Sequence, residues 1–321
     1  MATAEQMKML IKSHFDQNND KFRTVVLQLA AHEAGQGHVA LAREIRELID
    51  KSRAGKVLPF NNELYELIHN ATSDYRLSDL VVSEELKNRI ERILSEFKQR
   101  ERLRKHGLGN RRKILLTGPP GTGKTMTAAV LAGELHLPLC TILVDKLVTK
   151  YMGETSAKLR LIFDAIHESP AVYLFDEFDA IGSERAMDND VGEMRRVLNA
   201  FLQFIEQDKS DSVIVAATNS IKLLDQALFR RFDDILYYSF PTQADVINLI
   251  NNRLAGFCLL PQRALLSIVK DASNLSHADI TKACDDAIKE AILNDQVTVS
   301  KNILQKMIIE RQSVYKRGEN S

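Results

Sequence analysis

The sequence has 321 residues and carries 43 Lys and Arg residues against 43 Asp and Glu residues, so its formal net charge is zero. This balance excludes a strongly basic nucleic-acid coat or an acidic tail as the main role of the chain, although a local patch can still occur. With 45% hydrophobic and 27% charged residues, the composition is that of a globular protein with about two domains.

The sequence shows no segment that we expect to span or cross a membrane. Its longest apolar runs, such as Val172 to Phe175 and Val213 to Ala217, are far shorter than the roughly 20 residues that a bilayer requires. The first ten residues lack a basic region followed by an apolar core, and the three cysteines are scattered and odd in number. We therefore expect a reduced, cytoplasmic protein.

Residues 1–53 show three helical periods, of which the first two repeat apolar residues at i, i+3, i+4 and i+7. Turn-forming residues separate them at Asn18 to Asp20 and at Gly35 to Gly37. We predict an N-terminal three-helix module that recruits a substrate or a partner protein. Residues 54–76, which contain Gly55 and Pro59, are predicted to be a linker.

Residues 77–241 alternate between helical stretches and short apolar runs. The runs are Lys113 to Thr117, Leu139 to Val144, Ala171 to Asp176, Ser212 to Thr218 and Ile235 to Phe240. Near-continuous apolar strands between helices indicate a mostly parallel sheet covered on both faces. Residues 242–321 show only helical periods, about four of them. The predicted fold is therefore an α/β domain with a parallel sheet flanked by helices and a C-terminal four-helix subdomain.

A glycine-rich loop follows the first of these runs and precedes a helical stretch. It reads Gly118, Pro119, Pro120, Gly121, Thr122, Gly123, Lys124, Thr125. Glycines let the backbone N–H groups turn toward phosphate oxygens, the lysine reaches the β and γ phosphates, and the threonine hydroxyl ligates Mg²⁺. A flexible turn would not require the Lys-Thr pair, so we predict a site for ATP with Mg²⁺.

Two carboxylates, Asp176 and Glu177, end the third apolar run. An acid at such a strand end can hold Mg²⁺, and a second acid beside it can take a proton from an attacking water. Alone, this pattern equally describes a strand followed by a solvated acidic turn. Together with the phosphate loop it predicts Asp176 and Thr125 as metal ligands and Glu177 as the catalytic base.

These motifs resemble the AAA family of hexameric ATPases, and the resemblance covers about Leu77 to Arg311. It implies that Asn219, at the end of the fourth run, contacts the γ-phosphate and water. It also implies that Arg230 and Arg231 reach the nucleotide site of a neighbouring subunit as arginine fingers. The form of this segment is similar to the katanin and spastin branch. Without the neighbouring motifs, two adjacent arginines are usually solvated or in ion pairs.

The same resemblance assigns further residues around the nucleotide. His277 and Ala278 stand where the family places Gly-Ala, with its backbone near the adenine and ribose, and His277 is a departure from that pattern. Ser276 and Asp279 keep a capping-box spacing, which predicts a helix start there. Leu80 and Val81 resemble the segment that lies over the adenine, with apolar packing as the alternative.

The loop with Tyr151, Met152 and Gly153 resembles the family's pore loop, where an aromatic ring grips an extended polypeptide. A tyrosine between polar residues is otherwise often a packing residue. The resemblance implies a ring, most simply a homohexamer, that remodels a protein substrate. The alternatives are a nucleic-acid motor that uses the basic stretch Lys98 to Lys113, where we favour a solvated face or a subunit contact, and a slow nucleotide-dependent switch.

Overall fold

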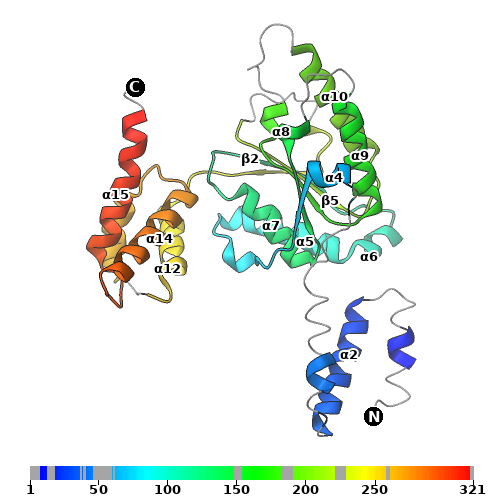
Figure 1. The fold of residues 1–321 in the computed structure, drawn as a ribbon, viewed down its shortest axis with the longest axis horizontal. Helices are drawn as coiled ribbons and strands as arrows, with labels where there is room; N and C mark the ends of the chain where they lie inside the picture. The colour runs from blue at the N-terminus through cyan, green and yellow to red at the C-terminus, as the bar shows by residue number, and fades with distance from the viewer. Residues whose placement is uncertain are drawn as a thin grey trace. The chain divides into compact units, whose positions relative to one another are not determined.

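The computed structural model describes residues 8–12, 19–36, 38, 41–45, 60, 62–147, 154–181, 191–220, 229–257 and 261–318. Contacts divide the chain into two units, Met1–Lys56 and Val57–Ser321. In the first unit, α2 spans Asn19–Gly35, and helical residues also occur at 8–12 and 41–45 (Figure 1). Val25 and Ala30 give α2 a buried side, in agreement with the amphipathic period of the sequence.

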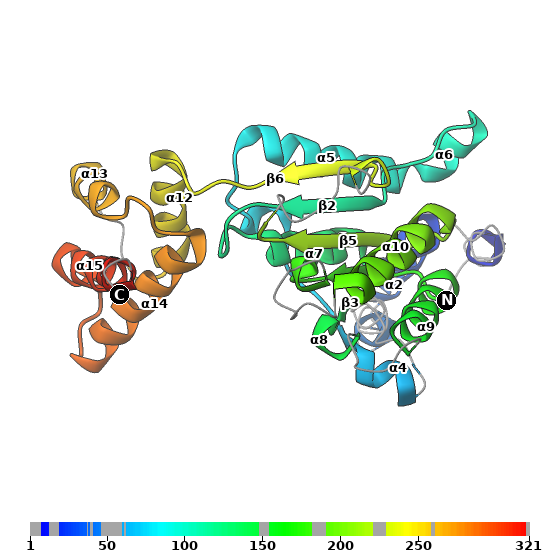
Figure 2. The same ribbon diagram turned by 90° about the horizontal axis from the view of Figure 1, so that it is seen from above.

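A six-stranded sheet organises the second unit. Its strands are β1 (Ile68–Ala71), β2 (Lys113–Thr117), β3 (Leu139–Ile142), β4 (Val172–Phe175), β5 (Val213–Thr218) and β6 (Asp234–Tyr237). They lie in the order β1-β3-β4-β5-β2-β6, and all pairs are parallel except β1 with β3. Figure 2 shows β6, β2 and β5 side by side. The five apolar runs of the sequence are thus confirmed as strands of a mostly parallel sheet.

Helices cover both faces of this sheet. On β4, Val172 and Leu174 belong to a core with α5 (Glu84–Lys98) and α7 (Lys124–Leu135). Tyr173 and Phe175 belong to a second core with α9 (Glu154–Glu168) and α10 (Val191–Gln207). All four strand residues are buried because side chains alternate between the two covered faces. Further short elements among the described residues are η1 (Leu77–Asp79), α6 (Arg100–Lys105), α8 (Val144–Leu147) and η2 (Phe178–Ile181).

The structure differs from the sequence prediction in residues 54–76, which we expected to be a linker. Part of this stretch forms α4 (Asn62–Leu67) and β1, and β1 adds an antiparallel edge to the sheet. The next residues are tied to α7, because Ser73 Oγ donates to the Ala129 carbonyl at 2.7 Å and Arg76 Nη1 donates to the Gly133 carbonyl at 2.8 Å. A short edge strand and single polar side chains that bond to a distant helix produce no periodic apolar pattern, so the sequence did not indicate them.

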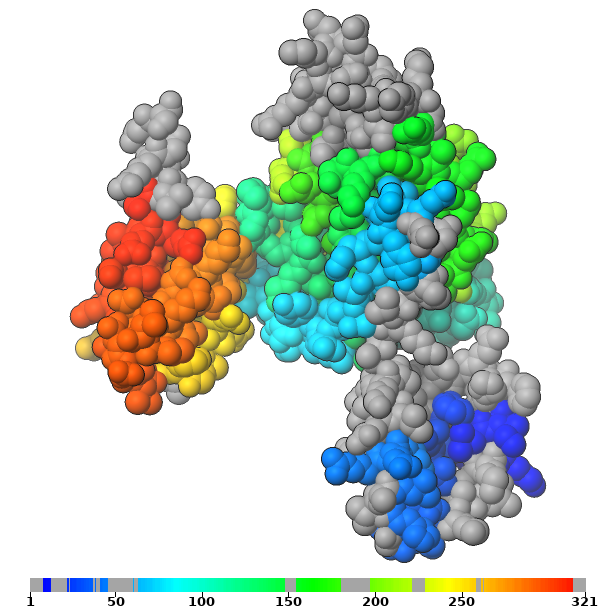
Figure 3. Space-filling view, in the orientation of Figure 1, coloured from blue at the N-terminus to red at the C-terminus, as the bar shows by residue number. Residues whose placement is uncertain are grey.

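The C-terminal subdomain consists of α12 (Gln243–Leu254), α13 (Gln262–Asp271), α14 (His277–Leu293) and α15 (Lys301–Gly318). These four helices form one body with its own apolar core, drawn from yellow to red in Figure 3. They confirm the four-helix subdomain that the sequence predicts. None of the helices that the structure describes combines the length and the apolar character needed to cross a membrane.

Candidate active site

The phosphate loop joins the end of β2 to the start of α7. Gly118 comes so close to the carbonyl of Tyr238 that a Cβ atom at this position would overlap it. Gly121 and Gly123 have φ angles of +72° and +102°, which L side chains rarely adopt. Gly123 is the N-cap of α7 and has no side chain with which to cap the first N–H groups of the helix. These groups and the helix dipole therefore favour an anion at this point.

Lys124 lies inside the loop and is only 6% exposed. Its Nζ atom donates to the carbonyls of Gly118 at 2.7 Å and Pro119 at 2.8 Å. Burial lowers the pKa of Lys124 from its ordinary value, and the nearby Asp176 and Asp179 carboxylates oppose that shift. Thr122 is also buried and donates its hydroxyl to Pro119 O at 2.7 Å, so the loop is held from within.

The two predicted metal ligands are in contact. Thr125 Oγ1, in the first turn of α7, donates to Asp176 Oδ2 after β4 at 2.7 Å. A hydroxyl and a carboxylate are hard oxygen donors of the kind that Mg²⁺ takes from proteins beside phosphate groups. The residues present therefore fit a magnesium ion bound next to the loop.

Glu177 follows Asp176 and is exposed, with a φ angle of +51°. Its backbone N–H donates to Asp176 Oδ1 at 2.9 Å. A non-glycine residue in this conformation is uncommon and is found more often at functional sites. The backbone of Glu177 is therefore fixed at the strand end, and its exposed carboxylate is accessible to water.

Asn219 lies at the end of β5, the strand next to β4, and its side chain is exposed. The backbone N–H of Asn219 donates to Asp179 Oδ1 at 3.3 Å, which joins the end of β5 to η2 after Glu177. We did not predict a role for Asp179 from the sequence. Its only local signal is that it is the third acid within four residues after β4.

The start of α14 contacts the phosphate loop. Ser276 forms a capping box with Asp279, as predicted, and Ala278 N donates to Gly121 O at 3.0 Å. His277 is half-buried, and its Nδ1 atom is buried without a hydrogen-bond partner among the described residues. Burial lowers the pKa of His277, and Asp245 opposes that shift.

The adenine-side candidates lie on the other flank of the loop. Leu80 is buried, and its Cδ1 atom would be 3.6 Å from a Cβ atom built on Gly123, while Val81 is half-buried. The structure thus brings Leu80 and Ala278 to the same loop from distant parts of the chain. Apolar packing remains an adequate explanation for Val81.

The two predicted arginines are not part of this cluster. Arg231 Nε forms an ion pair with Glu206 of α10 at 3.2 Å, and Arg230 is exposed. Tyr151, Met152 and Gly153 of the predicted pore loop lie outside the described residues. The segments that come together within one chain are therefore the phosphate loop, the ends of β4 and β5, and the start of α14.

The basic stretch from Lys98 to Lys113 meets more acids than its sequence neighbourhood suggests. Glu101 is the only acid within the stretch, but the fold adds carboxylates from α5, α7 and β6 and from the turn between α10 and β5. The ion pairs are Lys98 with Glu134, Arg104 with Glu101 and Asp211, Arg111 with Glu96 and Asp234, and Arg112 with Asp208. This pairing reduces the positive charge available to a nucleic acid.

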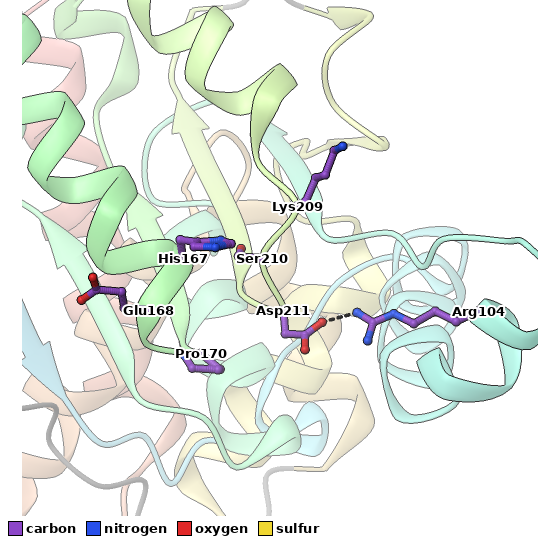
Figure 4. Close-up of a pocket in the computed structure, with 7 residues that line it drawn as sticks. All are labelled: Arg104, His167, Glu168, Pro170, Lys209, Ser210 and Asp211. Atoms are coloured by element: carbon purple, nitrogen blue, oxygen red, sulfur yellow. Dashed lines mark hydrogen bonds and ion pairs between the residues drawn. The ribbon is translucent and has the colours of Figure 1, made fainter.

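A polar hollow of about 390 Å³ lies at the opposite edge of the sheet, before the starts of β4 and β5 (Figure 4). Arg104 forms an ion pair with Asp211 at one side of it, and Lys209 and His167 also line it. Because the strands run parallel, this hollow is separated by the length of the sheet from the phosphate loop. It takes no part in the candidate active site.

Comparisons with known proteins agree with these features. The family described as "ATPase family associated with various cellular activities (AAA)" matches residues 114–240. An uncharacterized AAA family ATPase of Sinorhizobium fredii is 31% identical over 91% of this chain and 90% of that protein. The chain therefore belongs to the AAA family of ATPases, which confirms the resemblance seen in the motifs, and ATP hydrolysis is the activity that this membership implies.

Two other relatives match this chain over only part of their own length. The ATP-dependent zinc metalloprotease FtsH of Helicobacter pylori is 29% identical over 76% of this chain and 40% of that protein. The proteasome-activating nucleotidase of Methanosphaerula palustris is 32% identical over 64% of this chain and 51% of that protein. The crystal structure of the FIGL-1 AAA domain has a TM-score of 0.61 at 22% identity, covering 81% of this chain and 95% of that one, and shows the shared fold.

Proposed function

We propose that this chain is a magnesium-dependent ATP phosphohydrolase that remodels a protein substrate as a ring of subunits. The observation that carries the chemical part is the hydrogen bond from Thr125 Oγ1 to Asp176 Oδ2. It joins the start of α7, where an anion is favoured, to the strand end that carries Glu177. The phosphate loop, the proposed metal ligands and the proposed base thus lie at the same edge of the sheet.

Each residue at this edge has a distinct role in the proposal. The N–H groups of α7 and Lys124 bind the phosphates, and Thr125 and Asp176 hold the metal ion. Bound Mg²⁺ supplies charge neutralisation on the phosphate oxygens. Glu177 accepts a proton from the attacking water, and Asn219 orients that water.

The arginines and the ring form the second part of the proposal. Arg230 and Arg231 lie outside the cluster within one chain, so a neighbouring subunit would have to supply them to the site. There a guanidinium would neutralise charge on the transferred phosphoryl group. This requirement favours an assembly in which active sites are shared, and the resemblance implies six subunits.

The substrate class rests on the family and on its relatives. FtsH and the proteasome-activating nucleotidase carry names that connect ATP hydrolysis with proteolysis, which favours a protein substrate for this chain too. We propose that Tyr151, Met152 and Gly153 grip it in a central channel and that the module of residues 1–53 recruits it or a partner. The ion pairs of Arg111 and Arg112 in the basic stretch make nucleic acid a weaker candidate.

The test compares Glu177→Gln with Lys124→Ala in steady-state phosphate release and in binding of a fluorescent ATP analogue. Glu177→Gln should bind the analogue like the parent and lose about 10²-fold or more in turnover, because an amide cannot accept the proton. Lys124→Ala should lose binding as well. Glu168→Gln is the matched control, because this exposed glutamate lies at the opposite edge of the sheet and should turn over like the parent.

Parental turnover in Glu177→Gln would refute the assigned base. Copurification with Glu177→Gln in the presence of ATP is the corresponding test for the substrate. A captured polypeptide that stimulates hydrolysis by the parent would support remodelling, whereas stimulation by single-stranded DNA or RNA alone would refute it.

A further inference from the structure

Tyr238 and Thr127 form a buried hydrogen bond beneath the phosphate loop. The distance from Tyr238 Oη to Thr127 Oγ1 is 2.6 Å, although the two residues are 111 positions apart. Thr127 Oγ1 also donates to Gly123 O at 3.0 Å. A threonine hydroxyl has one proton to give, so the tyrosine must be the donor in the first bond. A directed chain of hydrogen bonds therefore runs from Tyr238 through Thr127 to the carbonyl of Gly123.

The backbone of Tyr238 contacts the other end of the same loop. Tyr238 N donates to Thr117 O at 2.7 Å, directly before the loop, and the carbonyl of Tyr238 excludes any side chain at Gly118. One residue thus touches the loop at Gly118 with its main chain and reaches Gly123 through its side chain. Gly123 precedes the first turn of α7, whose N–H groups face the predicted phosphates.

Burial protects the hydrogen bond between Tyr238 and Thr127. Tyr238 is 6% exposed and Thr127 is fully buried, so water does not compete for their bond. Burial raises the pKa of the Tyr238 phenol, which therefore keeps the proton that it donates. Tyr238 also lies four residues before Thr242, the N-cap of α12, and thus on the connection between the sheet and the C-terminal helices.

We propose that Tyr238 is a positioning residue that sets the conformation of the phosphate loop for nucleotide binding, acting through Thr127 on the carbonyl of Gly123. This inference rests on the proposed function, since it concerns the same nucleotide site. Nothing in the local sequence around either residue signals the pair. We expect loss of this contact to change nucleotide affinity and not kcat, because the loop binds the phosphates equally in the ground state and in the transition state.

The test is the conservative variant Tyr238→Phe, which removes one hydroxyl and leaves no cavity. We expect its KM for ATP and its Kd for a fluorescent ADP analogue to rise about tenfold, with kcat within about twofold of the parent, the signature of lost uniform binding. Thr127→Val should act in the same way, and Thr127→Ser, which retains the hydroxyl, should restore parental KM.

Tyr173→Phe is the matched control. Tyr173 is fully buried, and its hydroxyl lies within hydrogen-bond distance of two carbonyls, Ala165 O at 3.0 Å and Ser169 O at 2.9 Å, at the far end of α9 and away from the loop. It should lower the melting temperature while leaving KM unchanged. The double variant Tyr238→Phe/Thr127→Val should bind no more weakly than the worse single variant, whereas independent effects would multiply to about a hundredfold.

The outcomes separate this inference from the proposed function. Parental KM and Kd in Tyr238→Phe, with only a lower melting temperature as in Tyr173→Phe, would overturn the positioning role and leave the ATPase assignment intact. Multiplied losses in the double variant would overturn the coupling through Thr127. A parent protein that binds no nucleotide would instead overturn the proposed function, and this inference with it.

Discussion

Replacing Gly121 by alanine should disrupt the contact between the phosphate loop and the start of α14. At Gly121→Ala, the new Cβ would lie 2.5 Å from Ser276 Oγ and 3.3 Å from Ala278 Cβ. Ser276 cannot turn aside at no cost, because its hydroxyl donates to Asp279 Oδ2 at 2.6 Å and accepts from Asp279 N at 3.2 Å. Either the loop or the helix start must move.

The magnitude follows from three contributions of similar size. Alanine at a φ of +72° costs about 1 kcal/mol. Displacing the Ser276 cap costs about 1 kcal/mol, and losing the Ala278 N to Gly121 O hydrogen bond costs about 1 kcal/mol more. We therefore expect a destabilisation of about 3 kcal/mol, together with a loss of about tenfold or more in affinity for nucleotide, because the loop is displaced.

Gly107→Ala is the matched control for the backbone contribution. Gly107 also has a φ of +72°, but nothing lies within 4 Å of its added Cβ. It should lower the melting temperature by only about 2 to 4 °C and leave nucleotide affinity unchanged. Adding Ser276→Gly to Gly121→Ala removes the two nearest atoms and should recover part of both losses.

Thermal unfolding and titration with a fluorescent ADP analogue measure these effects. Equal shifts in melting temperature for Gly121→Ala and Gly107→Ala, with unchanged affinity in both, would show that the contact between the loop and α14 does not hold the loop.

Three further predictions address assembly, substrate grip and pH. Mixing Lys124→Ala with Arg231→Ala protein should restore part of the ATP turnover that each lacks alone, and no recovery in verified mixed rings would contradict action between subunits. Tyr151→Ala should keep ATP turnover and lose the ability to unfold a protein substrate. If Tyr151 were instead a packing residue, the substitution would destabilise the protein by about 3 kcal/mol and lower both ATP turnover and substrate unfolding. Burial lowers the pKa of His277 from 6.5, so the unfolded chain binds its proton more readily and stability should fall as pH drops below about 6.5. His277→Gln should show a smaller fall in melting temperature between pH 7 and pH 5 than the parent, and an equal fall would contradict this cause.

Most residues of the candidate site could be predicted from short local motifs in the sequence. The glycine-rich loop with Lys124 and Thr125 requires only a strand before it and a helix after it, and the structure has both. The acids at 176 and 177 end an apolar run, and parallel strands present such ends at one edge of the sheet. The capping box of Ser276 with Asp279 is likewise a pattern of four consecutive residues. Motifs of this kind can be recognised in the sequence because the backbone geometry of one turn or one helix start fixes their spacing.

The tertiary structure alone decided which distant residues meet. The antiparallel edge strand β1 and the straps from Ser73 and Arg76 to α7 depend on partners more than 55 residues away. The same holds for the bond between Tyr238 and Thr127 and for the contact of Ala278 with Gly121. Such pairings depend on the order of strands and on the packing of helices over the sheet, which leave no periodic mark on the sequence between the partners. The local motifs thus indicate that the chain binds a nucleotide, and the long-range packing supplies the contacts that surround the phosphate loop.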